Sequence, residues 1–167
     1  MAASASFDVS TGADLQEVDN AVNQALKEIG QRYDFKGSHC LIQFDRARAA
    51  LTLEADDDFR MRALFDVLQT KLIRRGVPLK NLKVGDLAPA AGGRVRRVLT
   101  LTQGIPQDAA RAIVKAVKEH DFKKVQVAIQ GDELRVSSPS KDTLQEVIAF
   151  LRGQDFGIEL KFGNYRS

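Results

Sequence analysis

RYDFKGS, at residues 32–38, and EHDFKKV, at residues 119–125, share the tripeptide Asp-Phe-Lys. In both places the tripeptide follows a stretch with helical periodicity and precedes a stretch in which apolar and polar residues alternate. We expect Phe35 and Phe122 to pack beneath the corner between helix and strand, with the neighbouring Asp and Lys side chains in water. The repeated corner therefore predicts two similar structural units in one chain.

The residues around the first corner predict the order β-α-β-β-α-β. Apolar residues at helical spacing run from Leu15 to Ile29 and again from Met61 to Leu72, where Gly76 and Pro78 follow. Short strands are predicted between the two helices at 38–44 and 50–54, with SFDVS (6–10) and LKVGD (82–86) as the outer strands. Because SFDVS is short, an alternative is that it pairs with a strand of the other unit.

The residues around the second corner predict the same order. RVRRVLTLTQ (94–103) is typical of a strand, and a helical stripe follows Pro106. KVQVAIQ (124–130) and ELRVS (133–137) alternate strictly on either side of Gly131-Asp132, which predicts a tight hairpin. A second helix with Leu144 and Leu151 on its stripe and a last strand, GIELKF (157–162), complete the unit.

The predicted fold class is α+β, with two tandem ferredoxin-like (βαββαβ) domains. Each domain is expected to have a four-stranded antiparallel sheet with two helices on one face. GDLAPAAGGR contains Pro and Gly without periodicity and predicts a break between the domains. The predicted boundaries are 1–86 for the first domain, with the alternative pairing for its N-terminal strand, 87–93 for the linker and 94–167 for the second domain.

The composition is that of an ordinary globular protein. The 167 residues are 44% apolar, no apolar run is long enough to span a membrane, and MAASASFD lacks the features of a signal peptide. We therefore expect a cytoplasmic protein without a membrane partner. The single cysteine, Cys40, excludes an internal disulfide.

The charge is unevenly divided along the chain. The net charge is +3; residues 1–88 carry 12 Lys and Arg against 13 Asp and Glu, whereas residues 89–167 carry 13 against 9. The second half is therefore where a phosphate-bearing partner is expected.

The face of the second sheet that the helices leave open is predicted to be polar and positively charged. Its expected central strands, RVRRVLTLTQ and ELRVS, contain no aromatic residue, so the base stacking used by RNA-recognition modules is disfavoured and Arg, Lys and hydroxyl contacts would have to replace it. The chain end, FGNYRS, adds an amide, an aromatic ring and a guanidinium, for which a ligand role and a packing role both remain open. The candidate nucleotide-binding residues are Arg96, Thr100, Thr102, Lys124, Gln126, Gln130, Arg135, Asn164, Tyr165 and Arg166.

Catalysis has little support in the sequence. His39 and His120 fall in different units, no phosphate-binding Gly-rich loop is present, and the run of acids at 56–58 is better explained as a helix cap than as a metal site. We expect no enzymatic activity, no cofactor and no metal. The leading hypothesis is binding of a nucleotide, a cyclic dinucleotide or single-stranded RNA through the open face and a groove between the domains. The alternative is a protein–protein adaptor or a partner of a transcription regulator with no nucleotide ligand.

Several segments together resemble the YajQ family of bacterial proteins. They are SFD (6–8), QRYDFKGS (31–38), TQGI (102–105), IVKAVK (113–118), VQVAIQGDELRVSS (125–138), LQEVI (144–148) and FGNYR (162–166). The resemblance runs nearly from end to end. It implies a tandem of ribonucleoprotein-like domains in a cytosolic, nucleotide-binding protein, with nucleic acid and cyclic di-GMP among the ligand classes associated with the family.

Overall fold

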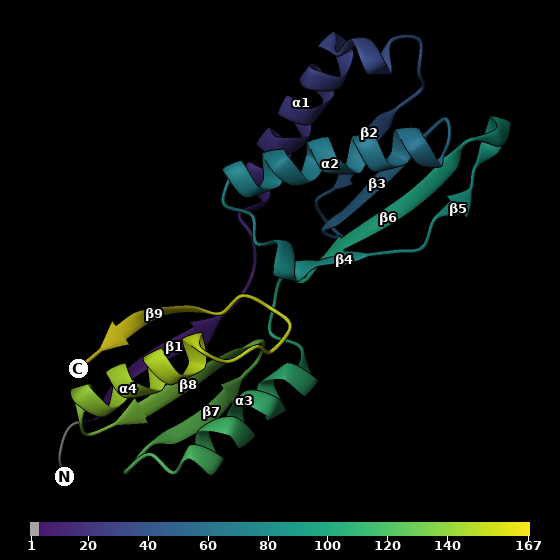
Figure 1. The fold of residues 1–167 in the computed structure, drawn as a ribbon. Helices are drawn as coiled ribbons and strands as arrows, with labels where there is room; N and C mark the ends of the chain where they lie inside the picture. Colours follow the sequence, from purple (N-terminus) through teal and green to yellow (C-terminus); the bar gives the residue numbers. More distant parts are fainter. Residues whose placement is uncertain (1–3) are drawn as a thin grey trace. The chain divides into compact units, whose positions relative to one another are not determined.

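The computed structural model describes residues 4–167 (Figure 1). Residues 1–3 belong to the predicted first domain and to the N-terminal stretch that was expected not to be a signal peptide, and they lie outside the described residues. The helices are α1 (Leu15–Gln31), α2 (Asp58–Arg74), α3 (Gln107–His120) and α4 (Lys141–Arg152). The strands are β1 (Ala5–Ser10), β2 (Leu41–Asp45), β3 (Ala50–Ala55), β4 (Leu82–Val84), β5 (Ala88–Pro89), β6 (Val95–Leu101), β7 (Gln126–Gln130), β8 (Glu133–Ser138) and β9 (Lys161–Arg166).

The predicted fold class is confirmed: the chain has two antiparallel sheets, each covered on one face by two helices. The two compact units are not consecutive halves of the chain. One, here called the terminal unit, combines the N-terminal residues up to Gly12 with Gln103–Ser167, and the other, the middle unit, is Ala13–Thr102. Among residues 4–167, no helix has both the length and the apolar character needed to cross a bilayer.

The sheet of the terminal unit has the strand order β7-β8-β1-β9. Figure 1 shows β1, in the purple of the N-terminus, between green β8 and yellow β9. Phe7 and Val9 of β1 are fully buried, and Phe7 lies opposite Val136 of β8. Phe7 and Val9 belong to the core beneath α3 and α4, so β1 completes the core of the terminal unit and not that of the middle unit.

The sheet of the middle unit has the strand order β2-β3-β6-β4, with the short β5 also beside β6. β6 is antiparallel to β3, and buried Leu99 lies opposite buried Leu51. These leucines join the core formed with α1 and α2. β6 therefore has the same place in the middle sheet as β1 has in the terminal sheet.

The predicted domain boundaries are corrected by this pairing. β6 was assigned to the second domain, but it belongs to the first sheet, and 87–93 is a connection inside the middle unit rather than a linker between domains. The alternative left open for SFDVS, pairing with the other unit, is what the structure has. The physical reason is that alternation identifies a strand and its buried face, but contains no information on which sheet it joins. Pairing of β6 with β4 is also favoured because β4 is close in sequence, and strands joined by a short connection tend to pair.

The two Asp-Phe-Lys corners place their phenylalanines as expected. Phe35 is buried in the core of the middle unit, at the turn that follows α1. Phe122 is half-buried against the core of the terminal unit, and its ring stacks on His120 at 4.1 Å between centroids. Both corners are therefore structural features of the fold.

Candidate functional site

Asp8 lies near the centre of the open face of the terminal sheet. Because Phe7 and Val9 point to the helices, the alternation of β1 directs Asp8 to the opposite face. Its carboxylate accepts hydrogen bonds from Arg135 Nε at 3.1 Å, Asn164 Nδ2 at 2.6 Å and Arg166 NH2 at 3.3 Å. Arg166 NH1 also donates to Ser6 Oγ at 3.3 Å. We call Asp8, Arg135, Asn164 and Arg166 the Asp8 cluster.

The Asp8 cluster keeps its carboxylate ionised. Burial of the side chain, which is only 12% exposed, acts to raise the pKa of Asp8. Hydrogen bonds from Asn164, Arg135 and Arg166 stabilise the charged form more strongly, so the pKa of Asp8 lies below its usual value. At neutral pH the cluster therefore contains two guanidinium ions and one carboxylate, with one positive charge in excess.

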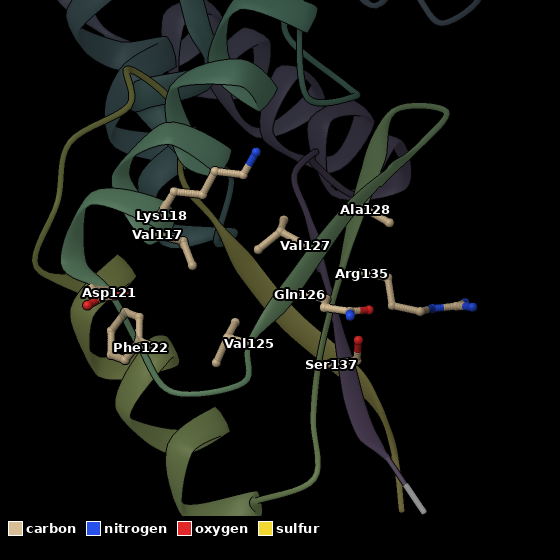
Figure 2. A pocket seen from close by; sticks show the side chains of 10 residues that line it. All are labelled: Val117, Lys118, Asp121, Phe122, Val125, Gln126, Val127, Ala128, Arg135 and Ser137. Atoms are coloured by element: carbon tan, nitrogen blue, oxygen red, sulfur yellow. The ribbon is translucent and has the colours of Figure 1, made fainter. Parts of the chain in front are cut away.

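Arg135 and Arg166 are both held by Asp8 and open to solvent. Their side chains are 37% and 41% exposed. Arg135 is held through Nε, and within residues 4–167 its two terminal amino groups have no hydrogen-bond partner. Figure 2 shows Arg135 extending away from the side of the strands on which Val117 and Phe122 lie. A guanidinium fixed in this way has donors ready for an anion, at a reduced loss of side-chain entropy.

The surroundings of the Asp8 cluster are polar. The strand alternation and pairing place Ser6, Ser10, Gln126, Gln130, Ser137 and Lys161 on the same face. The aromatic side chains of the strands lie elsewhere: Phe7 is fully buried under the helices and Phe162 packs against the same core. The central strands are β8 and β1 rather than the expected pair, and the aromatic residue of β1, Phe7, points away from the open face.

Three of the predicted site residues lie in the other unit. Arg96 and Thr100 are on the open face of the middle sheet, and Thr102 follows β6, where its backbone N–H donates to the Asn81 carbonyl. The predicted binding face combined β6 with β7 and β8. Because β6 pairs with β3 of the middle sheet, the predicted residues lie on two different sheets. Arg96 donates from Nε to the Glu54 carboxylate at 2.9 Å, and in the part of the chain that the structure describes this carboxylate is its one ion-pair partner.

The remaining predicted residues divide between the faces of the terminal unit. Gln126, Gln130, Arg135, Asn164 and Arg166 share the open face. Lys124 precedes β7 in a left-handed conformation, with a φ of 54°. Tyr165 contacts Phe7 on the helix side, with ring centroids 6.4 Å apart, and joins Leu144 of α4 in lining a hollow. Tyr165 remains 60% exposed, so it lies at the edge of the sheet beside Phe7, whereas Asn164 and Arg166 contact Asp8 on the open face.

An irregularity in β9 makes this division possible. The pairing of β1 with β9 shifts between Ser6 and Asp8, and Asn164 has a φ of 55°. Such a bulge adds a residue to one strand and redirects side chains. Gly163, opposite Asp8, already faces the open side. Because of the extra residue, Asn164 also points at Asp8, and Tyr165 turns to the other side.

Ser6 and Asp8 were missed as site residues. The alternation within SFDVS already separates Ser6 and Asp8 from Phe7 and Val9. What the sequence lacked was the partner of this strand: in register with β8, Asp8 lies directly opposite Arg135.

The net charge of each unit differs from the expected value, because the units contain other residues than the predicted domains. The middle unit, residues 13–102, carries 15 Lys and Arg against 12 Asp and Glu, whereas the rest of the chain carries ten of each. The expectation of a basic second domain is therefore wrong for the units as they fold. The case for an anion site in the terminal unit depends on the arrangement of the Asp8 cluster and not on net charge.

Cys40, Asp56 and Asp57, which also have reactive groups, are accounted for by burial and by local hydrogen bonds. Burial raises the pKa of the Cys40 thiol, which disfavours the nucleophilic thiolate. Asp57 caps α2 by accepting from the Arg60 N–H at 2.7 Å, and Asp56 accepts from the His39 N–H. Within residues 4–167 no group of three or more His, Cys, Asp or Glu side chains is placed to hold a metal ion.

Comparison with known proteins gives a consistent result over the whole chain. Residues 5–166 match the family model described as "Nucleotide-binding protein YajQ-like". A protein of Desulforamulus reducens is 48% identical over 167 residues, which is 100% of this chain and 99% of the relative. A protein of Trichlorobacter lovleyi is 45% identical over 161 residues, 96% of this chain and 98% of the relative. Both relatives are named "Nucleotide-binding protein". The chain therefore belongs to the YajQ-like family.

Proposed function

We propose that this chain is a non-enzymatic, regulatory nucleotide-binding protein that receives the phosphate groups of its ligand at the Asp8 cluster. The observation that carries the proposal is that one ionised carboxylate holds two half-exposed guanidinium groups on a polar face. The names of the relatives and the family support a nucleotide as ligand. A single nucleotide, cyclic di-GMP and single-stranded RNA are the ligand classes to test.

The chemistry of the cluster suits a phosphodiester or a terminal phosphate. Asp8 accepts a hydrogen bond from Arg135 Nε and one from Arg166 NH2, and Ser6 accepts one from Arg166 NH1. The remaining N–H groups of the two guanidiniums can donate to phosphate oxygens. Ser137, Gln126 and Lys161 on the same face offer further donors to phosphate or ribose. Base recognition by stacking on this face would depend on a guanidinium plane rather than on an aromatic ring.

Calorimetric titration of the nucleic-acid-free protein with GTP, cyclic di-GMP and a short single-stranded RNA tests the proposal. Each hydrogen bond to a charged group is worth about 1.5–3 kcal/mol, so Arg135→Ala and Arg166→Ala should each weaken binding roughly tenfold or more. Arg96→Ala is the matched control, since it also removes an exposed arginine paired with a carboxylate on an open face. The affinity of Arg96→Ala for the same ligand should stay within about twofold of the affinity of the unmodified protein.

Two results would overturn the proposal. Equal losses for Arg96→Ala and Arg135→Ala would remove the special role of the cluster. Absence of binding to all three ligands would favour the adaptor function, in which the chain contacts a partner protein without a nucleotide. Thermal melts of each variant separate loss of binding from loss of folding.

A further inference from the structure

We propose that β7 is a self-association edge through which two copies of this chain join their terminal sheets. β7 is the outermost strand of its sheet, and among residues 4–167 its strand partner is β8 alone. Its sequence, QVAIQ, has no charged residue and no proline. A strand edge of this kind presents unpaired backbone donors and acceptors to any strand that can lie beside it.

The other edge strands of the described chain have features that discourage such pairing. β2 ends in Asp45, β4 contains Lys83, and β5 contains Pro89. β9, the opposite edge of the terminal sheet, begins with Lys161, ends with Arg166 and is bulged. Charge, proline and bulges are the usual means of protecting an edge, and β7 alone among these strands lacks all three.

The outward-facing backbone groups of β7 can be assigned from its hairpin. The turn at Gly131-Asp132 has two residues, so Gln130 and Glu133 form the hydrogen-bonded pair nearest the turn. Gln126 and Ala128 then also direct their backbone groups to β8. The backbone groups of Val127 and Ile129 point away from the sheet and are available to a further strand.

The second copy is favoured as the occupant because β7 is complementary to itself. In an antiparallel pair centred on Ala128, Gln126 lies opposite Gln130 of the other copy and Val127 lies opposite Ile129. Amide side chains then meet on the open face and apolar side chains meet on the helix side. The outward backbone groups of Val127 and Ile129 face each other in this register, so they form hydrogen-bonded pairs.

The edge also has room for the incoming side chains. A hollow of about 520 Å³ runs along β7, with Val117, Phe122, Val125 and Val127 on the helix side. Figure 2 shows these side chains together on one side of the strand, opposite Gln126 and Arg135. Ile129 is 41% exposed in the single chain. In the paired form, Ile129 of one copy would lie beside Val127 of the other, over the apolar part of this hollow, which Lys118 and Asp121 border.

Pairing would make the two open faces continuous. Arg135 lies opposite Ala128, one strand in from the edge, so the two copies of Arg135 would be three strand spacings apart, about 14 Å. The association itself does not depend on nucleotide binding, and it can be measured on the protein alone.

Sedimentation or light scattering of the full chain tests the proposal. Association follows mass action, so the apparent mass should rise toward twice 18.4 kDa as the concentration increases from about 5 µM to about 1 mM. Ala128→Lys and Ala128→Glu each place like charges directly opposite one another, and each variant alone should remain monomeric. An equimolar mixture of the two variants should associate again, because opposite charges then meet.

Two further variants sharpen the result. Val127→Pro removes an outward N–H and should abolish association while β7 keeps its bonds to β8. Ala88→Lys is the matched control, because Ala88 is also an exposed alanine on an edge strand, and it should associate like the unmodified chain. A chain that stays monomeric at the highest concentration, an Ala128→Lys variant that still dimerises, or a mixture that fails to associate would each overturn the proposal. Circular dichroism confirms that the variants are folded.

Discussion

The open faces of the two sheets have one feature in common and differ in what surrounds it. Each sheet has an acid and an arginine directly opposite one another on its two central strands, Asp8 with Arg135 in the terminal sheet and Glu54 with Arg96 in the middle sheet. In the terminal sheet β9 adds Arg166 and Asn164 to the pair, whereas Glu54 has Arg96 as its only ion-pair partner among the described residues.

This difference leaves the two open faces with different charges and different free hydrogen-bond donors. A carboxylate with one arginine neutralises its charge, but a carboxylate with two arginines leaves a positive charge and free donors at a fixed place. The middle unit has the larger net charge, yet its open face has the balanced pair. The proposed anion site therefore depends on the position of charges on a surface and not on their sum over a unit.

The comparison of the two open faces requires that β1 belongs to the terminal sheet. The Phe7→Ala variant tests this, and it has the largest expected effect on stability. Removing a fully buried phenylalanine typically costs about 3–5 kcal/mol. Hydrogen exchange should accelerate in β7, β8 and β9 and stay nearly unchanged in β2 and β3. The reverse pattern would mean that β1 completes the middle sheet instead.

Asp8→Asn against Glu54→Gln tests whether the two acids differ in their contribution to stability. Asp8 accepts three charge-assisted or amide hydrogen bonds, so its replacement should lower the free energy of unfolding by about 2 kcal/mol at pH 7. Glu54 has a single arginine partner and its replacement should cost less than about 1 kcal/mol. Urea unfolding measures both, and equal costs would contradict the special role of the Asp8 cluster.

The pH dependence of the Asp8 contribution has a defined sign. The pKa of Asp8 is lowered in the folded state, so the unfolded chain binds its proton more readily. The stabilisation is fully present above the unfolded pKa of about 3.9 and is lost as the pH falls through the lower folded value. The difference between the unmodified protein and Asp8→Asn should therefore shrink below about pH 4, provided both remain folded. A difference that is constant down to pH 3 would contradict this assignment.

Salt dependence gives the smallest of these effects. If Arg135 neutralises one phosphate of a single-stranded RNA, Arg135→Ala should reduce the slope of log affinity against log salt by about 0.7. Arg96→Ala should leave the slope unchanged. Binding isotherms at several salt concentrations provide the measurement, and a slope that changes only with Arg96→Ala would move the phosphate site to the middle sheet.

The sequence predicted the elements well but not the way in which they join. Helices, hairpins and corners follow from local periodicity, and the burial of Phe35 was correctly predicted for this reason. The exchange of β1 and β6 between sheets is a choice among long-range partners, with β1 paired to a strand more than a hundred residues away. Alternation along SFDVS and RVRRVLTLTQ is compatible with either sheet, so local patterns could not decide between them.

The candidate site was only partly predictable for the same reason. Arg135 was named from strand alternation, and Asn164 and Arg166 were named from their residue types at the chain end. Arg96, Thr100 and Thr102 were included because β6 was assigned to the wrong sheet. Asp8 was missed because its importance appears only when β1 lies between β8 and β9. The position of Tyr165 on the core side depends on the bulge at Asn164, which strict alternation does not predict.

The central claim is that the nucleotide binds at the Asp8 cluster, and chemical-shift mapping tests it most directly. A ¹⁵N-labelled full-length chain would be titrated with GTP and, separately, with a short single-stranded RNA. We predict that at least one of these ligands shifts amide signals in β1, β8 and β9 around Asp8, Arg135 and Arg166, while β3 and β6 around Glu54 and Arg96 remain unchanged. Shifts confined to the middle unit, with the Asp8 cluster unaffected at saturation, would contradict the claim.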